Sequence, residues 1–152
     1  MDQIVFVDAN IFLEIFLKNS KIEDCKNFLE KSRLGNISAF TSDFIVYTCL
    51  IQIQCKTKEL NTLKDFVIFI NTLNLNILKL NIANIPKTIE FMSKYNLDFD
   101  DALVVSFMKD NHISNLISYD KDFDKVNIIK REEPSRYLLK EKNDKSELSN
   151  KK

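Results

Sequence analysis

The sequence predicts an α/β layer sandwich around a mostly parallel sheet of five strands. The first sign is the run Ile4-Val5-Phe6-Val7, whose β-branched and aromatic residues without alternation are typical of a strand buried on both faces. The second is that further short apolar runs alternate with stretches of helical periodicity. At 152 residues, of which 45% are hydrophobic, the chain fits one domain with a complete core.

The individual elements follow from these signals in chain order. Strands are expected at residues 4–7, 37–40, 75–80, 115–118 and 126–129, and helices at 11–18, 24–34, 44–51, 60–73, 86–95 and 99–110. Gly35 suits the position after a helix end, one of Thr41, Ser42 and Asp43 caps the next helix, and Pro86 suits a first turn. Residues 1–139 should form the domain, and the polar segment 140–152 should lack regular structure.

Rare residues and a balanced charge exclude several classes of function. Lysine plus arginine (22) equals aspartate plus glutamate (22), so no net field draws the molecule to nucleic acid or an anionic membrane. The single glycine cannot build a Gly-rich phosphate-binding loop. The single histidine, His112, is expected in solvent at a helix end, and it cannot by itself make a zinc site.

Cysteine usage and hydropathy indicate the compartment. Cys25, Cys49 and Cys55 show no paired spacing and are expected to be reduced, buried thiols. The N-terminus has no basic leader, and no window approaches the ~20 apolar residues of a membrane span. We therefore expect a cytoplasmic protein that does not enter a membrane.

Three aspartates that are distant in sequence occupy positions at which parallel sheets bind ligands. Asp8 follows the first expected strand, Asp120 follows the fourth, and Asp101 opens the helix before that fourth strand. Such a cluster without histidine or paired cysteine suits a hard divalent cation such as Mg²⁺ or Mn²⁺. Each aspartate taken alone is also explained as a cap or turn residue.

Three segments carry a resemblance to the PIN-domain ribonucleases. They are Val7-Asp8-Ala9-Asn10-Ile11-Phe12, Leu97-Asp98-Phe99-Asp100-Asp101-Ala102-Leu103 and Ser118-Tyr119-Asp120-Lys121-Asp122-Phe123-Asp124. Their order and spacing resemble the motifs of that family over residues 2 to 130. The resemblance implies a three-layer α/β/α sandwich with strand order 3-2-1-4-5, in which strands one and four are neighbours.

The resemblance also implies a site and an activity. The residues that would be catalytic and coordinate one or two Mg²⁺ or Mn²⁺ ions are Asp8, Asp101 and Asp120. Asn10 would hold Asp8, Asp122 would assist, and Ser118 stands where a hydroxyl contacts the site. The reaction would be endonucleolytic hydrolysis of RNA with metal-bound water as the nucleophile. Small stand-alone members, such as the VapC-like proteins, are often toxins whose antitoxin partner inserts a peptide near the acidic pocket.

One position departs from the family pattern. The helix after the second strand usually carries a glutamate, whereas Thr48 stands there in this chain and no acid lies between Asp43 and Glu59. Asp43 would lie about 140° from Thr48 around an ideal helix, so it is a poor substitute. The loss of one carboxylate should weaken cation binding and reduce activity.

Substrate and partners are expected at the surface around this site. Basic residues that could guide RNA are Lys18, Lys21, Lys31, Arg33, Lys56 and Lys58. Phe12 and Phe16 are the aromatic residues considered for base stacking, although most phenylalanines have core spacing. Broad apolar helix surfaces predict a homodimer or a bound partner segment.

Two other hypotheses remain. The fold could persist as an RNA-binding or assembly module without chemistry, which Thr48 supports. A phosphoacceptor receiver domain is also an α/β fold with acids at strand ends. That class needs paired acids after the first strand, and Asp8-Ala9-Asn10 lacks the pair.

Overall fold

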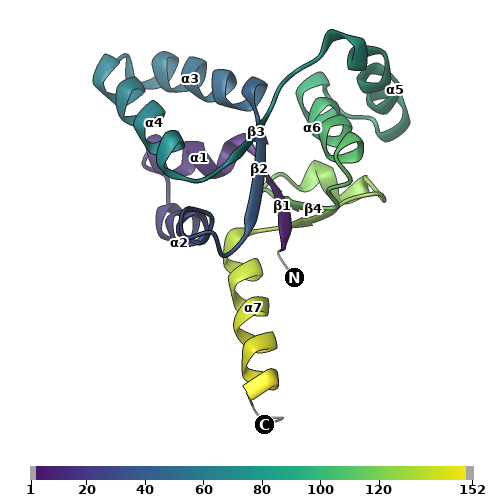
Figure 1. Ribbon diagram of the computed structural model, residues 1–152. Coiled ribbons are helices and arrows are strands. Elements are labelled where there is room, and N and C mark those ends of the chain that lie inside the picture. The colour runs from purple at the N-terminus through teal and green to yellow at the C-terminus, as the bar shows by residue number, and fades with distance from the viewer. Residues whose placement is uncertain (1–2, 150–152) are drawn as a thin grey trace.

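The computed structural model describes residues 3–149, and a sheet of five parallel strands lies at its centre (Figure 1). The strands are β1 (Ile4–Val7), β2 (Ser38–Ser42), β3 (Asn76–Leu78), β4 (Asn115–Ile117) and β5 (Lys130–Glu132). Their order in the sheet is β3-β2-β1-β4-β5, and each neighbouring pair is parallel. The predicted α/β class and the strand order 3-2-1-4-5 are confirmed.

Helices cover both faces of this sheet, which gives the three layers (Figure 1). The helices of one layer are α1 (Ala9–Phe16), α2 (Ile22–Arg33), α3 (Asp43–Thr57) and α4 (Leu60–Thr72). The other layer contains α5 (Ile85–Tyr95) and α6 (Phe99–Asp110), which pack on each other. The last helix, α7 (Pro134–Ser149), packs against α2, and two short 3₁₀ helices are η1 (Ile82–Asn84) and η2 (Lys121–Lys125). None of the helices within residues 3–149 has the length and apolar character that a membrane span requires.

The core is organised around β1, the central strand. Val5, Phe6 and Val7 are fully buried, because their alternating side chains face the two helical layers. Phe6 stacks on Phe107 of α6 with ring centroids 6.4 Å apart. The continuous apolar run therefore reflects burial on both faces of the sheet.

The pairing of β1 with β4 decides where the polar residues after these strands emerge. Val7 lies opposite Ile117 in the parallel register, and the Asp8 backbone N–H donates to the Ile117 carbonyl at 3.1 Å. Asp8 and Ser118 consequently leave the sheet side by side at its carboxyl edge. The strand order reverses at this point, where open α/β sheets bind their ligands.

Local sequence signals explain several helix ends. The Ser42 side-chain oxygen accepts the Ile45 N–H at 3.2 Å and so caps α3. Pro86 lies in the first turn of α5, where a missing N–H costs nothing. Gly35 follows the end of α2 with φ +72°, a conformation that suits glycine. His112 is exposed just beyond α6, as expected.

The last strand differs from its predicted position. We expected it at residues 126–129, but β5 is Lys130–Glu132. Val126 is buried as part of the loop before the strand, so its apolar character reports packing and not strand structure. β5 itself is an edge strand, for which a charged sequence such as Lys-Arg-Glu is well suited.

The polar C-terminal segment is also different from the prediction. We expected residues 140–152 to lack regular structure, whereas α7 continues through Lys140 to Ser149; residues 150–152 lie outside the described part. Glu141 explains part of this, because it pairs with Lys145 one helical turn later and with Lys31 of α2. Tyr137 anchors the start of the helix by packing edge-on against Phe28 at 5.4 Å.

Replacing Gly35 by alanine tests the conformation at the end of α2. We expect Gly35→Ala to lower the free energy of unfolding by about 1 kcal/mol, because a β-carbon disfavours positive φ. The nearest atom to that β-carbon would be Asn74 Nδ2 at 3.9 Å, so no clash adds to the cost. Urea denaturation measures the change. Gly35→Asn, which tolerates positive φ better, serves as the control, and an equal loss in both variants would contradict the backbone explanation.

Candidate metal centre

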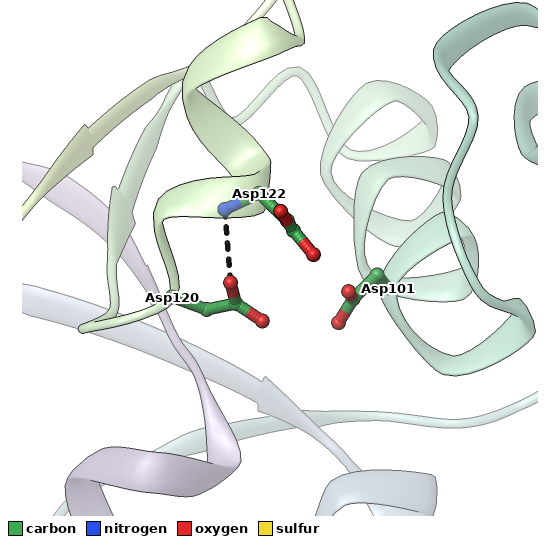
Figure 2. Close-up of side chains that lie close together, drawn as sticks. All are labelled: Asp101, Asp120 and Asp122. Atoms are coloured by element: carbon green, nitrogen blue, oxygen red, sulfur yellow. Dashed lines mark hydrogen bonds between the residues drawn. The ribbon is translucent and has the colours of Figure 1, made fainter.

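Three carboxylates converge at the carboxyl edge of the sheet (Figure 2). Asp101 lies in the first turn of α6, Asp120 caps η2, and Asp122 lies within η2. Each side chain contributes one carboxylate oxygen, and these three oxygens all lie within 4.8 Å of one another. Oxygens that share one Mg²⁺ lie up to about 4 Å apart, so small side-chain rotations suffice for all three to bind one ion.

The structure of η2 explains why two of these acids lie together. Asp120 Oδ1 accepts the Asp122 N–H at 2.9 Å, as an N-cap does, and this bond is drawn in Figure 2. Phe123 is fully buried and fixes the short helix to the core. Asp122 is therefore exposed on the turn while Asp120 is half-buried beside it.

Asp8 lies next to this group and is enclosed by hydrogen bonds. Its Oδ1 accepts the Ala9 N–H at 2.8 Å, and its Oδ2 accepts from Ser118 Oγ at 2.6 Å and Asn10 Nδ2 at 3.0 Å. Only 8% of Asp8 is exposed. Within residues 3–149, the close group is Asp101, Asp120 and Asp122, and Asp8 adjoins it from the buried side.

Asn10 and Ser118 join the loops that follow β1 and β4. Ser118 Oγ accepts from Asn10 Nδ2 at 3.0 Å and from the Asp120 N–H at 3.0 Å. Asn10 Oδ1 accepts the Tyr119 N–H at 3.2 Å. These hydrogen bonds hold the loops of Asp8 and Asp120 together, although the two residues are distant in sequence.

Electrostatics make the acidic group costly without a cation. Burial, followed by the negative charges of Asp100, Asp120 and other acids, raises the pKa of Asp101 to about 7. The pKa of Asp8 is raised to about 6, chiefly by burial, with Asp120 and Asp100 adding to the effect and the Ser118 hydrogen bond opposing it. A donor set made only of oxygens and carrying excess negative charge fits Mg²⁺ or Mn²⁺.

The helix α3, on which we expected a glutamate and find Thr48, packs beside Asp8. Cys49 of α3 is buried, and its Sγ donates to the Ala9 carbonyl at 3.8 Å. Thr48 is half-buried on the same helix and outside the close acidic group. Asp43 does not take the glutamate's place, because its Oδ1 accepts the N–H groups of Phe44 and Leu80.

Among the thiols, Cys25 is also buried, whereas Cys55 is exposed, contrary to expectation.

The structure separates the six basic residues that were candidates for guiding RNA. Lys21 Nζ lies 4.7 Å from the ring centre of Tyr119 and 3.7 Å from a carboxylate oxygen of Glu133. Lys31 pairs with Glu141 and Arg33 with Glu30. The remaining three, which line separate hollows beside α3, are Lys18, Lys56 and Lys58.

The two phenylalanines considered for stacking belong to the core. Phe12 is fully buried, and Phe16 packs edge-on against Phe66 and Phe69. Sequence reasoning missed Phe99, the first residue of α6 and two positions before Asp101, which is 37% exposed and contacts Phe44 edge-on. The position of Phe99 within the sequence motif around Asp101 is the feature that could have identified it.

A parallel α/β sandwich with a group of carboxylates at the β1–β4 edge defines the class of this protein. The model of the PIN domain matches residues 5–129, and the chain therefore belongs to the PIN-domain family. Comparison with curated proteins gives no match.

Solved structures show the same fold at low sequence identity. VapC20 of Mycobacterium tuberculosis, a Sarcin-Ricin loop cleaving toxin, is 12% identical with a TM-score of 0.68, over 81% of this chain and 95% of that one. VapBC2 of Rickettsia felis, bound to a DNA fragment from its promoter, is 15% identical with a TM-score of 0.69, over 86% and 98%. A toxin–antitoxin complex from Klebsiella pneumoniae is 16% identical with a TM-score of 0.64, over 86% and 97%.

The raised pKa of Asp101 predicts how its contribution to stability depends on pH. Between the ordinary pKa of 3.8 and about 7, folded Asp101 holds a proton that the unfolded chain releases. Folding is therefore penalised progressively as pH rises through this window, and the penalty is complete above it. Asp101→Asn removes it, so without divalent ions the variant should melt at a higher temperature than wild type at pH 7.5.

Thermal melts in a chelator at pH 4 and pH 7.5 check this prediction. The two proteins should differ much less in melting temperature at pH 4, where the unfolded chain has released only part of this proton and most of the penalty is absent. A melting difference that does not change between the two pH values would show that the carboxylate is not destabilised by its surroundings.

Proposed function

We propose that this protein is an endoribonuclease that depends on Mg²⁺ or Mn²⁺. The observation that carries the proposal is the convergence of Asp101, Asp120 and Asp122 beside the buried Asp8 in a chain of the PIN-domain family. The cleavage of RNA described for a structural neighbour supports the substrate class.

The surroundings of each residue indicate the role that it would have in the reaction. Asp101, Asp120 and Asp122 would hold the cation, with Asp8 acting directly or through water. The cation would supply Lewis-acid stabilisation of charge on the phosphate and a water molecule of lowered pKa. Asn10 and Ser118 orient Asp8 by donating to its Oδ2.

Two further side chains are suited to hold the substrate. Lys21, which lies above the Tyr119 ring and pairs with Glu133, offers a positive charge that could contact the RNA backbone. Phe99, in the first turn of α6, presents a partly exposed ring on which an unpaired base could stack. The Phe99 ring favours a single-stranded or looped RNA as the substrate, because only unpaired bases can stack on it.

We further propose that the protein is the cytoplasmic toxin of a toxin–antitoxin pair and forms a homodimer. Structural neighbours include toxin–antitoxin complexes. An apolar groove of about 440 Å³ between α3 and α4 is lined by Leu50, Leu63, Lys64, Val67 and Ile68. Exposed apolar residues around it, including Tyr47 and Ile51, favour a protein partner on this face.

A catalytically weakened RNA-binding or assembly module is the second candidate. Thr48 favours it, because the helix beside Asp8 brings no carboxylate to the site. RNA that shifts in a mobility assay with Mn²⁺ but yields no fragments would favour this candidate over the nuclease.

Removal of a single carboxylate tests the nuclease. We expect Asp8→Asn and Asp101→Asn each to reduce Mn²⁺-dependent RNA cleavage at least ~100-fold, because the electrostatic groups at such a site each contribute that much. Asp65→Asn, at an exposed position on α4, is the matched control and should cleave like wild type. Cleavage that survives both site substitutions would remove the proposed site.

Restoring an acid at position 48 tests the meaning of the departure from the family. Thr48→Glu should increase cleavage and tighten Mn²⁺ binding, since a further carboxylate adds an oxygen ligand and negative charge. Thr48→Gln, similar in size but neutral, should do neither. Initial rates of cleavage against Mn²⁺ concentration distinguish the two, and equal behaviour of Glu and Gln would refute a role for charge.

A further inference from the structure

Arg131 of β5 binds both ends of the turn that carries Asp120 and Asp122. Its Nη1 donates to the Ser118 carbonyl at 2.9 Å, at the start of this turn. Its Nε and Nη2 donate to the two carboxylate oxygens of Asp124 at 2.7 Å and 3.1 Å, near the end. One guanidinium group thus bridges the segment from residue 118 to residue 124.

The arginine of this contact is enclosed by the fold, although its partner Asp124 is 54% exposed. The Arg131 side chain is only 10% exposed, and its residue lies opposite Leu116 in the β4–β5 register. A guanidinium offers parallel N–H groups in a rigid plane, which match the two oxygens of a carboxylate. A buried charge of this kind is stable only with such partners.

The turn that carries Asp120 and Asp122 needs contacts from outside the turn, such as those of Arg131, to hold its conformation. Asp120 and Asp122 lie near Asp101, and like charges at this distance repel one another. The turn has an apolar anchor in Phe123, which is fully buried. That anchor limits where the turn sits, but it does not neutralise charge or hold the main chain on the Ser118 side.

We propose that Arg131 is a positioning residue, which holds the turn so that Asp120 and Asp122 present their oxygens together with Asp101. It does not touch the cation or the RNA. The effect on cation binding rests on the proposed function, whereas the effect on the order of the turn does not.

The sign of the change separates positioning from simple electrostatics. Arg131 is a positive charge next to an acidic cluster, so by charge alone its removal should tighten the binding of a cation. If the arginine positions the ligands, its removal should weaken binding instead, because the oxygens no longer converge. Loss of a group that orients metal ligands costs on the order of tenfold in affinity.

The first experiment measures Mn²⁺ binding to RNA-free protein by electron paramagnetic resonance of the free ion. Arg131→Gln should bind Mn²⁺ about tenfold more weakly than wild type. The matched control is Arg33→Gln, which removes the same charge and an Arg–carboxylate pair with Glu30 from the surface of α2. It should bind like wild type. Binding by Arg131→Gln that is equal to or tighter than wild type would overturn the proposal.

The second experiment measures amide hydrogen exchange without any metal. The Asp122 N–H, which donates to Asp120 Oδ1, should exchange several-fold faster in Arg131→Gln and at the wild-type rate in Arg33→Gln. An unchanged exchange rate of the Asp122 N–H in Arg131→Gln would by itself overturn the proposal that Arg131 positions the turn. If wild type binds no Mn²⁺, the cation site of the proposed function fails, and this exchange result still decides the role of Arg131.

A second variant covers the case in which Arg131→Gln does not fold. Arg131→Lys keeps the charge but replaces the planar fork by a single ammonium group, which cannot make all the contacts of the guanidinium. It should fold and bind Mn²⁺ more weakly than wild type, with faster exchange at Asp122. If Arg131→Lys shows the Mn²⁺ binding and the Asp122 exchange rate of wild type, the planar guanidinium group does not position the turn.

Discussion

The parallel pairing of β1 with β4 is the constraint on which the rest of the site depends. The register of Val7 with Ile117 places the residues that follow, Asp8 and Ser118, next to each other at one edge of the sheet. Every later contact builds on this. The Ser118 hydroxyl reaches Asp8, Asn10 reaches across to the β4 side, and the turn that starts at Ser118 brings its acids toward α6. A parallel sheet with helices on both faces makes such a meeting possible between residues more than a hundred positions apart.

The same arrangement concentrates negative charge around Asp8, which is buried, and Asp101, which is half-buried. Burial and neighbouring acids raise the pKa of Asp8 and Asp101, so the folded protein carries an electrostatic cost there. Directed interactions elsewhere maintain the geometry against this repulsion: hydrogen bonds to Asp8 on one side and the guanidinium of Arg131 on the other. A site that stays assembled under repulsion is prepared for a cation, because little rearrangement is then needed on binding.

Membership of the PIN-domain family is compatible with this chemistry. The helix α3 packs against the loop of Asp8 through Cys49, while Thr48 of the same helix brings no negative charge. The apolar groove on the outside of α3 and α4 lies on the surface of the same layer. The layer that flanks the acidic edge therefore also carries this apolar groove.

Much of the fold could be predicted from the sequence because its signals are local. The apolar run of β1, the cap at Ser42 and the glycine after α2 each act within a few residues, and the motifs identified Asp8, Asp101 and Asp120 as candidates. Signals that depend on distant partners were misjudged. Val126 is a buried residue of the loop before β5, and α7 persists through a polar stretch because Glu141 pairs with lysines on two helices.

The sequence by itself determined which acids are available and that a parallel sheet would carry them. Only the tertiary structure decided their arrangement, with Asp122 in the close group and Asp8 enclosed beside it. The physical reason is that the direction of a side chain at a strand end depends on strand register and on the donors that neighbouring loops supply. Neither quantity is encoded in the spacing of residues along the chain.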